Sequence, residues 1–325
     1  MAFNLKCAVG ASVFWPPADR VVSTGYKPAI TEKDLFKSIG KVKEVEGVEL
    51  FYPYDFKDVK TIRIVLNEIG MKVCAVGAGI FSEPKWQYGS VTSYDEKIRK
   101  EAMDICKESI NAAAELGAKI FTFWPAHDGY DYYFQTDYKR KWYLIVESLR
   151  ELAAINKEIN IGIEYKAKEP RTHQIISSAA KALLISEETE MDNVGVIMDI
   201  GHSFICHENP AEEAVYLFNK NRLFHLHQND NYADWDFDMM PASVHFWENI
   251  ELFYWLYKLN YNGWINFDIC PFREDAVKAS ELSIKNIKKI VNFVKKIDSS
   301  LYKKAIDNNN ALINQEYIWD LLFKN

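Results

Sequence analysis

The sequence predicts an α/β protein built as a single closed (β/α)8 barrel, a TIM barrel, with a helical extension at its C-terminal end. Short apolar or β-branched runs alternate with longer segments of helical period from one end of the 325-residue chain nearly to the other. Eight such pairs follow one another without a linker, composition shift or charge run. The first strand is followed by GASVFWPP, which is not the glycine fingerprint that a doubly wound sheet would carry.

The predicted strands are short runs of Val, Ile, Phe and Ala bounded by polar residues or glycine. They cover residues 7–15, 48–53, 72–81, 118–126, 160–167, 194–202, 223–230 and 263–270. Each is followed by a segment with helical apolar spacing, often beginning at Asp, Ser or Thr and ending at Gly or Asn. The predicted helices cover residues 31–45, 56–70, 93–117, 137–159, 174–190, 209–220, 246–260 and 275–297. The barrel is therefore expected to occupy residues 1–297.

Residues 298–325 remain after the eighth helix. They contain the run ALINQEYIWDLLF, in which apolar residues recur at helical spacing. We expect a helical tail that either covers the bottom of the barrel or packs on another subunit, and the sequence leaves both possibilities open.

Charge and composition narrow the classes of partner. With 39 Lys and Arg against 46 Asp and Glu, the chain carries a net charge of −7, which disfavours binding to nucleic acid or to an anionic membrane. The cysteines show no C-x-x-C spacing, as is typical of thiols in a reducing compartment, and stand at Cys7, Cys74, Cys106, Cys206 and Cys270. The sequence shows no export signal and no apolar run long enough to span a membrane, so we expect a cytoplasmic protein.

Candidate metal ligands stand where four consecutive predicted strands end. This is where the active-site residues of a (β/α)8 barrel lie. In chain order these ends carry Glu164 and Lys166, Asp199 and His202, His225 and His227, and Asp268. A charge inside an apolar run costs several kcal/mol unless it is compensated, so something positive must lie near each carboxylate. Oxygen-rich ligation with one or two imidazoles is typical of Mg²⁺, Mn²⁺ or Co²⁺.

Two of these residues also allow a purely structural interpretation. Glu164 could form a buried ion pair with Lys166, which follows it by two positions. His225 faces the same side of its strand as His227 but one layer deeper, so we expect it to support the core or the ligands rather than to bind an ion. Four neighbouring strands that all end in Asp, Glu or His nevertheless favour a metal site, because packing alone prefers Val, Ile and Leu there.

The loop after the seventh strand adds two more acids. Asp236 and Asp238 alternate in an extended segment, so both side chains can point at one ion. On its own this D-x-D pattern is typical of a solvated turn. Together with His202 it could form a second ligand set beside the first, with Asp199 shared between two metal ions.

Five motifs follow one another from the fourth predicted strand to the eighth. They are FTFWPAHDGYDYYFQTDYKRKW at 121–142, EYK at 164–166, DIGH at 199–202, HLHQND followed by WDFD at 235–238, and the final NFDI. Together these motifs resemble the xylose isomerase and rhamnose isomerase group of metal-dependent sugar isomerases, within the xylose isomerase-like TIM barrel family. The resemblance covers more than half of the chain.

The resemblance implies a ligand set for one or two divalent ions (Mn²⁺, Mg²⁺ or Co²⁺). A first ion, which binds two substrate oxygens, would be held by Glu164, Asp199, His227 and Asp268. A second, catalytic ion would be held by Asp199, His202, Asp236 and Asp238. Lys166 would hydrogen-bond the oxygen at the sugar carbonyl, while a divalent ion polarises the carbonyl so that hydrogen moves between C1 and C2.

The resemblance also implies the substrate contacts. Trp15 and Trp124, at the ends of the first and fourth strands, would form an apolar wall that excludes water and stacks on the sugar. Lys166 and His202 would face the same substrate from the polar side. The two tryptophans also fit a simpler interpretation, as large residues that pack at the rim of the barrel.

Strand two departs from the family pattern. Tyr52 stands where the sugar isomerases keep a His that pairs with Asp to open the pyranose ring, although Asp55 remains. Tyr52, Tyr54 or His127 could replace that group, or the substrate could already be open-chain or a small branched sugar. The departure weakens the expectation of a specifically xylose-directed activity.

We therefore expect an aldose–ketose isomerase, an intramolecular oxidoreductase, with a ketose 3-epimerase as the alternative. In the 3-epimerases the counterparts of Glu164 and Asp268 act as a paired acid and base on opposite faces of C3. His227 is similar to both rhamnose isomerases and 3-epimerases, since xylose isomerases carry Asp there. The set of His202, Asp236 and Asp238 favours the isomerase.

Two other classes fit less well. A DNA-repair endonuclease of similar fold would need histidines on strands two and three and a basic groove, but the first 126 residues contain no His and the chain is acidic. A non-enzymatic sugar-binding or scaffold barrel would require the carboxylates to be mere ion pairs. Since family members are commonly dimers or tetramers, we expect a homodimer or homotetramer that acts on a small sugar.

Overall fold

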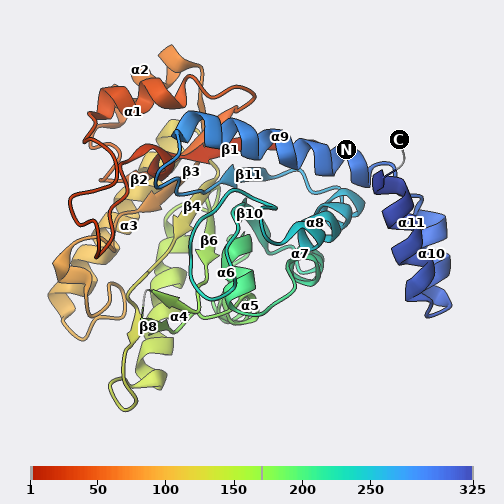
Figure 1. Cartoon of the computed structure of the whole chain (residues 1–325). Coiled ribbons are helices and arrows are strands. Elements are labelled where there is room, and N and C mark those ends of the chain that lie inside the picture. The colour runs from red at the N-terminus through yellow and green to blue at the C-terminus, as the bar shows by residue number, and fades with distance from the viewer. Residues whose placement is uncertain (1–2, 170, 324–325) are drawn as a thin grey trace.

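Eight parallel strands close into a barrel in the computed structural model, which describes residues 3–169 and 171–323. Around the barrel the order is β1-β11-β10-β9-β6-β4-β3-β2, so consecutive βα units lie side by side, with helices outside (Figure 1). The strands are β1 (Lys6–Gly10), β2 (Gly47–Tyr52), β3 (Lys72–Ala78), β4 (Ile120–Phe123), β6 (Asn160–Glu164), β9 (Val194–Asp199), β10 (Leu223–His227) and β11 (Trp264–Phe267). The predicted (β/α)8 barrel is confirmed.

Most strands end several residues earlier than the sequence predicts. After the last paired residue of each of these strands, the chain leaves the sheet, and its polar side chains lie at the mouth of the barrel. The clearest case is β9, which ends at Asp199 and passes at once into α6 (Ile200–Ile205). The Asp199 carboxylate accepts the backbone N–H of His202 at 2.9 Å, which is a helix N-cap. His202, expected on a strand, therefore lies in a helix.

Seven of the eight outer helices begin at a Thr, Asp, Ser or Asn whose side chain caps the helix, as the sequence predicts, and α8 is the exception. They are α1 (Glu32–Ile39), α2 (Val59–Ile69), α3 (Glu96–Leu116), α4 (Tyr138–Ile155), α5 (Ala179–Glu188), α7 (Pro210–Asn219), α8 (Phe246–Lys258) and α9 (Ala276–Val294). The side chain of Ser178 caps α5, which explains why this helix begins later than the predicted residue 174. Gly70 and Gly117 end α2 and α3 in the left-handed conformation that glycine favours. Within the described ranges, no helix is both long and apolar enough to cross a membrane.

A small antiparallel sheet joins the loops that follow β4 and β6. It consists of β5 (Gly129–Tyr130), β8 (Thr172–Gln174) and β7 (Lys168–Glu169), in that order. Two short 3₁₀ turns, η1 (Ala11–Phe14) and η2 (Pro84–Trp86), lie in other loops. Runs of two or three residues carry no periodicity, so the sequence does not predict these elements.

Gly162 in β6 leaves space in the barrel interior for the side chain of Ile197. A Cβ atom at Gly162 would lie 2.3 Å from Cγ1 of Ile197, which belongs to β9. Ile197 is fully buried in an interior cluster that also contains Ala8, Cys74, Ala75 and Ile120. The barrel interior is therefore closely packed below the C-terminal ends of the strands, where the predicted site residues lie.

Gly162→Ala should lower the free energy of unfolding by about 1–3 kcal/mol, because Ile197 must shift to admit the methyl group. Chemical denaturation of the variant measures the loss. Ile197→Ala also lowers the free energy of unfolding, but it removes the atoms that the new methyl group would meet. In the double variant, the methyl group at position 162 should therefore cause little further loss of free energy. Losses that simply add in the double variant would contradict this packing argument.

The tail forms two helices beyond the barrel, α10 (Ser299–Asp307) and α11 (Ala311–Phe323), which lie beside each other (Figure 1). Tyr302 of α10 packs on Tyr254 of α8, with ring centroids 4.9 Å apart, and Trp319 of α11 packs on Trp247 at 5.2 Å. No residue of α11 is buried within this chain. Packing of the tail on another subunit stays a prediction.

Candidate functional site

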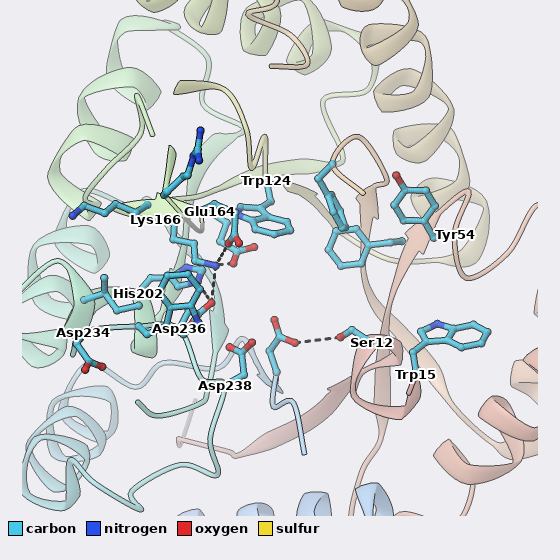
Figure 2. Close-up of a pocket in the computed structure, with 18 of the residues that line it drawn as sticks. Ser12, Trp15, Tyr54, Trp124, Glu164, Lys166, His202, Asp234, Asp236 and Asp238 are labelled. Carbon is cyan, nitrogen blue, oxygen red and sulfur yellow. Dashed lines mark hydrogen bonds and ion pairs between the residues drawn. The ribbon is translucent and has the colours of Figure 1, made fainter. Parts of the chain in front are cut away.

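A cavity of about 690 Å³ opens at the C-terminal ends of the barrel strands. Figure 2 shows its two different sides: charged groups, among them Lys166 and Asp236, gather on one side, and Trp15 and Tyr54 lie on the other. Among the described residues this cavity brings together most of the predicted site residues, including the predicted acids Glu164, Asp236, Asp238 and Asp268.

Three carboxylates surround one nitrogen of His227. Its Nδ1 lies 3.7 Å from Oε1 of Glu164, 3.8 Å from Oδ2 of Asp199 and 3.6 Å from Oδ2 of Asp268. These distances are too long for hydrogen bonds, and Nδ1 is a buried atom without a hydrogen-bond partner among the residues that the structure describes. Ligands placed about 2.1 Å from a shared divalent ion stand about 3 Å or more from one another. The four predicted ligands of the first ion therefore fit a metal centre.

The charges at this centre repel one another. Burial raises the pKa of the Asp268 carboxyl to about 7, and the neighbouring charges of Glu164 and Asp199 add to the increase against the opposing effect of His227. Burial likewise raises the pKa of Asp199, with a further increase from Glu164, although His202 acts in the opposite direction. A divalent cation would relieve this repulsion, which agrees with the geometry around His227.

The second predicted ligand set lies beside the first but is engaged with cationic groups of the chain. Nε2 of His202 lies 3.2 Å from Oδ2 of Asp236, and Nζ of Lys166 lies 2.7 Å from the same oxygen. Lys166 also pairs with Glu169. Burial would raise the pKa of Asp236, but Lys166 and His202 outweigh it, so the pKa of this carboxyl lies below its usual value. Asp236 is thus an ionised group held by two positive partners.

Asn229 connects the two ligand sets. Its amide nitrogen donates to Oδ2 of Asp199 at 3.0 Å and to Oδ1 of Asp238 at 3.2 Å. Asp238 adopts a φ of 44°, an uncommon backbone conformation that directs its carboxyl inward, and burial together with the charge of Asp236 raises its pKa well above the usual value. Occupation of this second set by another metal ion stays a prediction.

A buried aspartate holds both ends of the loop that supplies Asp236 and Asp238. The backbone of Asp230 pairs with Met239 through two hydrogen bonds of 3.0 and 2.8 Å. Its carboxylate accepts the N–H groups of Val244 and His245 at 2.8 and 3.0 Å and lies 2.8 Å from Nδ1 of His245. The loop therefore has a fixed base, although several of its residues are exposed.

Asp230→Ala should lower the free energy of unfolding by about 2–4 kcal/mol, because it leaves the partly buried N–H groups of Val244 and His245 without their acceptor. It should also expose the loop at residues 231–238 to proteolysis, which urea titration and mass-spectrometric mapping of the first cuts would detect. Asp234→Ala is the control, since Asp234 lies in the same loop but is exposed. Equal resistance of both variants to protease would show that Asp230 does not fasten the loop.

Aromatic rings form the other side of the cavity. Nε1 of Trp15 donates to Asp55 at 2.9 Å, which fixes the orientation of this indole. Trp124 packs on Phe81 with ring centroids 4.6 Å apart, and Nζ of Lys166 lies 5.3 Å from the centroid of the Trp124 ring. Both tryptophans line the cavity, so they have the position that a sugar-contacting wall requires.

Two predicted substrate contacts are not at the cavity. The hydroxyl of Tyr52 donates to Glu108 of α3 at 2.7 Å, on the outside of the barrel, and His127 is absent from the lining. Side chains alternate along a strand, so Phe51 faces the cavity and Tyr52 points away from it. Tyr54 lines the cavity in place of Tyr52. The structure therefore does not bring Tyr52 and His127 to the cavity with the other predicted site residues, and their contact with a substrate stays a prediction.

Glu49 is the main residue that the sequence analysis missed. This acid in the middle of β2 is buried, and Oε2 lies 2.8 Å from Nε2 of His227 and 3.4 Å from Nε2 of His225. The signal was the same as for the other acids, because Glu49 interrupts the apolar run GVELFY. His225 is fully buried beside His227, as expected for a supporting position.

A family model described as a xylose isomerase-like TIM barrel matches residues 37–297, and the chain belongs to this family. Among curated proteins, the xylose isomerase of Thermus thermophilus is 26% identical over 227 residues, which are 67% of this chain and 58% of that protein. The xylose isomerase of Bacillus velezensis is 25% identical over 198 residues, which are 58% of this chain and 44% of that protein. The chain thus matches only about half the length of these relatives.

Several solved structures superpose over most of the chain. A D-tagatose 3-epimerase-like protein gives a TM-score of 0.66 at 22% identity and covers 89% of this chain and 98% of its own. L-Ribulose 3-epimerase gives 0.68 at 13% identity, with 90% and 96% covered. A 3-keto-D-glucoside 4-epimerase from E. coli gives 0.67 at 18% identity, with 88% and 100% covered. At these identities the likeness shows a shared fold.

Proposed function

We propose that the protein is a divalent-metal-dependent enzyme that rearranges hydrogen on a small sugar, and that its reaction is the 3-epimerisation of a ketose. The observation that carries the proposal is the convergence of Glu164, Asp199 and Asp268 on the unpartnered Nδ1 of His227 beneath an open cavity. Three carboxylates and one imidazole are suitable ligands for Mn²⁺, Mg²⁺ or Co²⁺. When bound there, such an ion would polarise the sugar carbonyl and its neighbouring hydroxyl.

Glu164 and Asp268 are the acid and base of this proposal. Glu164 is the last residue of β6 and Asp268 directly follows β11; β9 and β10 lie between these two strands in the barrel, so the carboxylates approach the cavity from different sides. One carboxylate takes the proton from C3 of the ketose, which leaves an enediolate, and the other returns a proton to the opposite face. The C–H bond that breaks and the one that forms are on the same carbon, so the reaction needs no oxidant or reductant.

Two findings favour epimerisation over C1–C2 exchange. Several of the solved structures that share the fold are named as ketose 3-epimerases, and they correspond to this chain over nearly their whole length. The xylose isomerases match over only 58% or less of theirs. The proposal therefore takes the second of the two functions expected from the sequence.

Aldose–ketose isomerisation is the second candidate, and one group of residues favours it. Lys166, His202, Asp236 and Asp238 lie together beside the first ligand set. A proton-transferring pair at C3 has no need of a second ion or of an ammonium group near the carbonyl. In this reaction Lys166 would hydrogen-bond the carbonyl oxygen, and a second ion would bind Asp199, His202, Asp236 and Asp238.

The aromatic side of the cavity supports a sugar substrate in both reactions. Trp15 and Trp124 present apolar faces that can cover the C–H groups of a sugar, while the opposite side offers carboxylates and Lys166 to its hydroxyls. We further propose a cytoplasmic homodimer or homotetramer, in which the exposed faces of α11 contribute to contacts between subunits.

Removal of bound metal should lower the melting temperature of the purified protein by several degrees, because carboxylates drawn together without a cation repel one another. Differential scanning calorimetry before and after exhaustive EDTA treatment measures the shift. Added back in excess, Mn²⁺ should restore the original curve, whereas Na⁺ at equal ionic strength should not. Identical curves with and without EDTA would argue for simple ion pairs in place of a metal centre.

Incubation of the Mn²⁺-loaded protein with ketoses and aldoses in D2O should produce the C3 epimer of a ketose with deuterium at C3. The probes are D-tagatose, D-fructose, L-ribulose and D-xylose, and NMR of the separated products distinguishes C3 from C1–C2 change. Asp268→Asn should reduce this turnover by about 10²–10⁴-fold, because it removes one proton-transferring group.

Lys166→Met separates the two candidates. Under 3-epimerisation this variant should keep most of its turnover. An aldose product without solvent deuterium, lost in Lys166→Met and in Asp238→Asn, would replace the epimerase with the isomerase. A stronger effect of Lys166→Met on kcat than on KM would place the lysine in that reaction rather than in substrate binding.

A further inference from the structure

The carboxylate of Glu49 lies on the opposite side of the His227 ring from the candidate metal ligands. Glu49 is 1% exposed, in β2, and each of its oxygens is engaged. Oε1 accepts a hydrogen bond from the hydroxyl of Thr122 in β4. Oε2 accepts one from Nδ2 of Asn266 in β11 at 2.8 Å and lies 2.8 Å from Nε2 of His227. The carboxylate thus collects donors from three other strands.

This arrangement determines which nitrogen of His227 carries hydrogen. A carboxylate that accepts from Thr122 and Asn266 has no hydrogen to offer, so the short contact with Nε2 requires an N–H on that atom. In a neutral imidazole the lone pair then lies on Nδ1. Nδ1 is the atom that faces Glu164, Asp199 and Asp268 at 3.6–3.8 Å and has no hydrogen-bond partner.

We propose that Glu49 is a positioning residue that holds His227 in its Nε2–H tautomer and so makes Nδ1 a metal ligand. The inference rests on the proposed metal-dependent function. Glu49 does not line the cavity, and its hydrogen bonds join it to the ring of His227 and not to the three carboxylate ligands, so it can orient a ligand only through that ring. The bond also fixes the plane of the ring, because its partner is held in turn by Thr122 and Asn266.

A different role for Glu49 is to bind an ion itself. Glu49, Cys74 and His225 offer three ligand atoms within 4.8 Å of one another, a set that suits Zn²⁺. Against this role, Oε2 of Glu49 is already occupied by His227 and Asn266, and an ion would compete with both. We therefore favour the positioning role, and the experiment below separates the two.

The test is Mn²⁺ affinity, measured by calorimetric titration of the metal-free protein and three variants. Glu49→Leu keeps the volume but removes the acceptor, and we expect it to weaken Mn²⁺ binding about 10- to 100-fold. Glu49→Gln should lose less, because its carbonyl can still accept from His227. Thr122→Val is the matched control: it removes a hydrogen bond from the same carboxylate without touching His227, and its affinity should stay within about threefold of the wild type.

The tautomer itself can be observed without activity. In the metal-free protein labelled with ¹⁵N-histidine, long-range ¹H–¹⁵N spectra recorded at a pH at which His227 is neutral should show hydrogen on Nε2 and none on Nδ1, and Glu49→Leu should shift the hydrogen toward Nδ1. If Glu49→Leu does not fold, Glu49→Gln and Thr122→Val still allow the comparison, with an expected order of wild type, Thr122→Val, then Glu49→Gln in affinity.

Three results would overturn the inference. They are a wild-type tautomer protonated at Nδ1, Mn²⁺ affinities of the Glu49 variants equal to that of the wild type, and a Zn²⁺ ion bound in the wild type that disappears in both Glu49→Gln and Cys74→Ser. A wild type that binds no Mn²⁺ at all would instead refute the proposed function, and the tautomer measurement would still decide whether Glu49 orients His227.

Discussion

Electrostatic repulsion among the carboxylates at the barrel mouth is the constraint on which the other features of the site depend. Parallel strands end at one rim, so an acid at the end of each of several strands must converge with its neighbours. Glu164, Asp199 and Asp268 meet in this way around His227. The closely packed barrel below keeps these carboxylates in place despite their repulsion. A positive charge bound among them would therefore be strongly stabilised.

The two ligand sets on the charged side of the cavity differ in the positive groups that the chain places beside them. Around Asp236 it supplies Lys166 and His202, whereas Asp268 forms no ion pair with any Lys or Arg among the described residues and faces Nδ1 of His227 at 3.6 Å. This asymmetry explains why the pKa of Asp236 lies below its ordinary value while that of Asp268 rises. An external ion is therefore expected first at the His227 cluster, and the Asp236 group would have to release Lys166 before it could bind another.

Much of the fold and the ligand set follows from two signals in the sequence. Apolar periodicity locates the strands and helices, and charged residues inside apolar runs locate the acids. The failures have local causes. Tyr52 is adjacent in sequence to a cavity residue but points outward, since side chains alternate along a strand. Glu49 carries the same signal as the ligands, yet it sits in the middle of its strand, where no rule about strand ends would direct attention.

Other parts of the site leave no trace in the sequence. The contacts of Asn229 with Asp199 and Asp238 depend on how the loop folds back, and polar residues in loops are too common to indicate such a role. The strands of the small sheet are two or three residues long, below the length at which periodicity is informative.

That small sheet has a consequence for how members of this family can diversify. Its strands β7 and β8 follow Lys166 within a few residues, and β5 follows Trp124. The small sheet therefore connects the loop that carries Lys166 with the loop that carries Trp124, and both residues line the cavity. Insertions or substitutions in its turns would move both walls together while leaving the eight-stranded framework and its ligands in register. Under the proposed function, changes in these turns could alter substrate preference and leave the candidate ligand set unchanged.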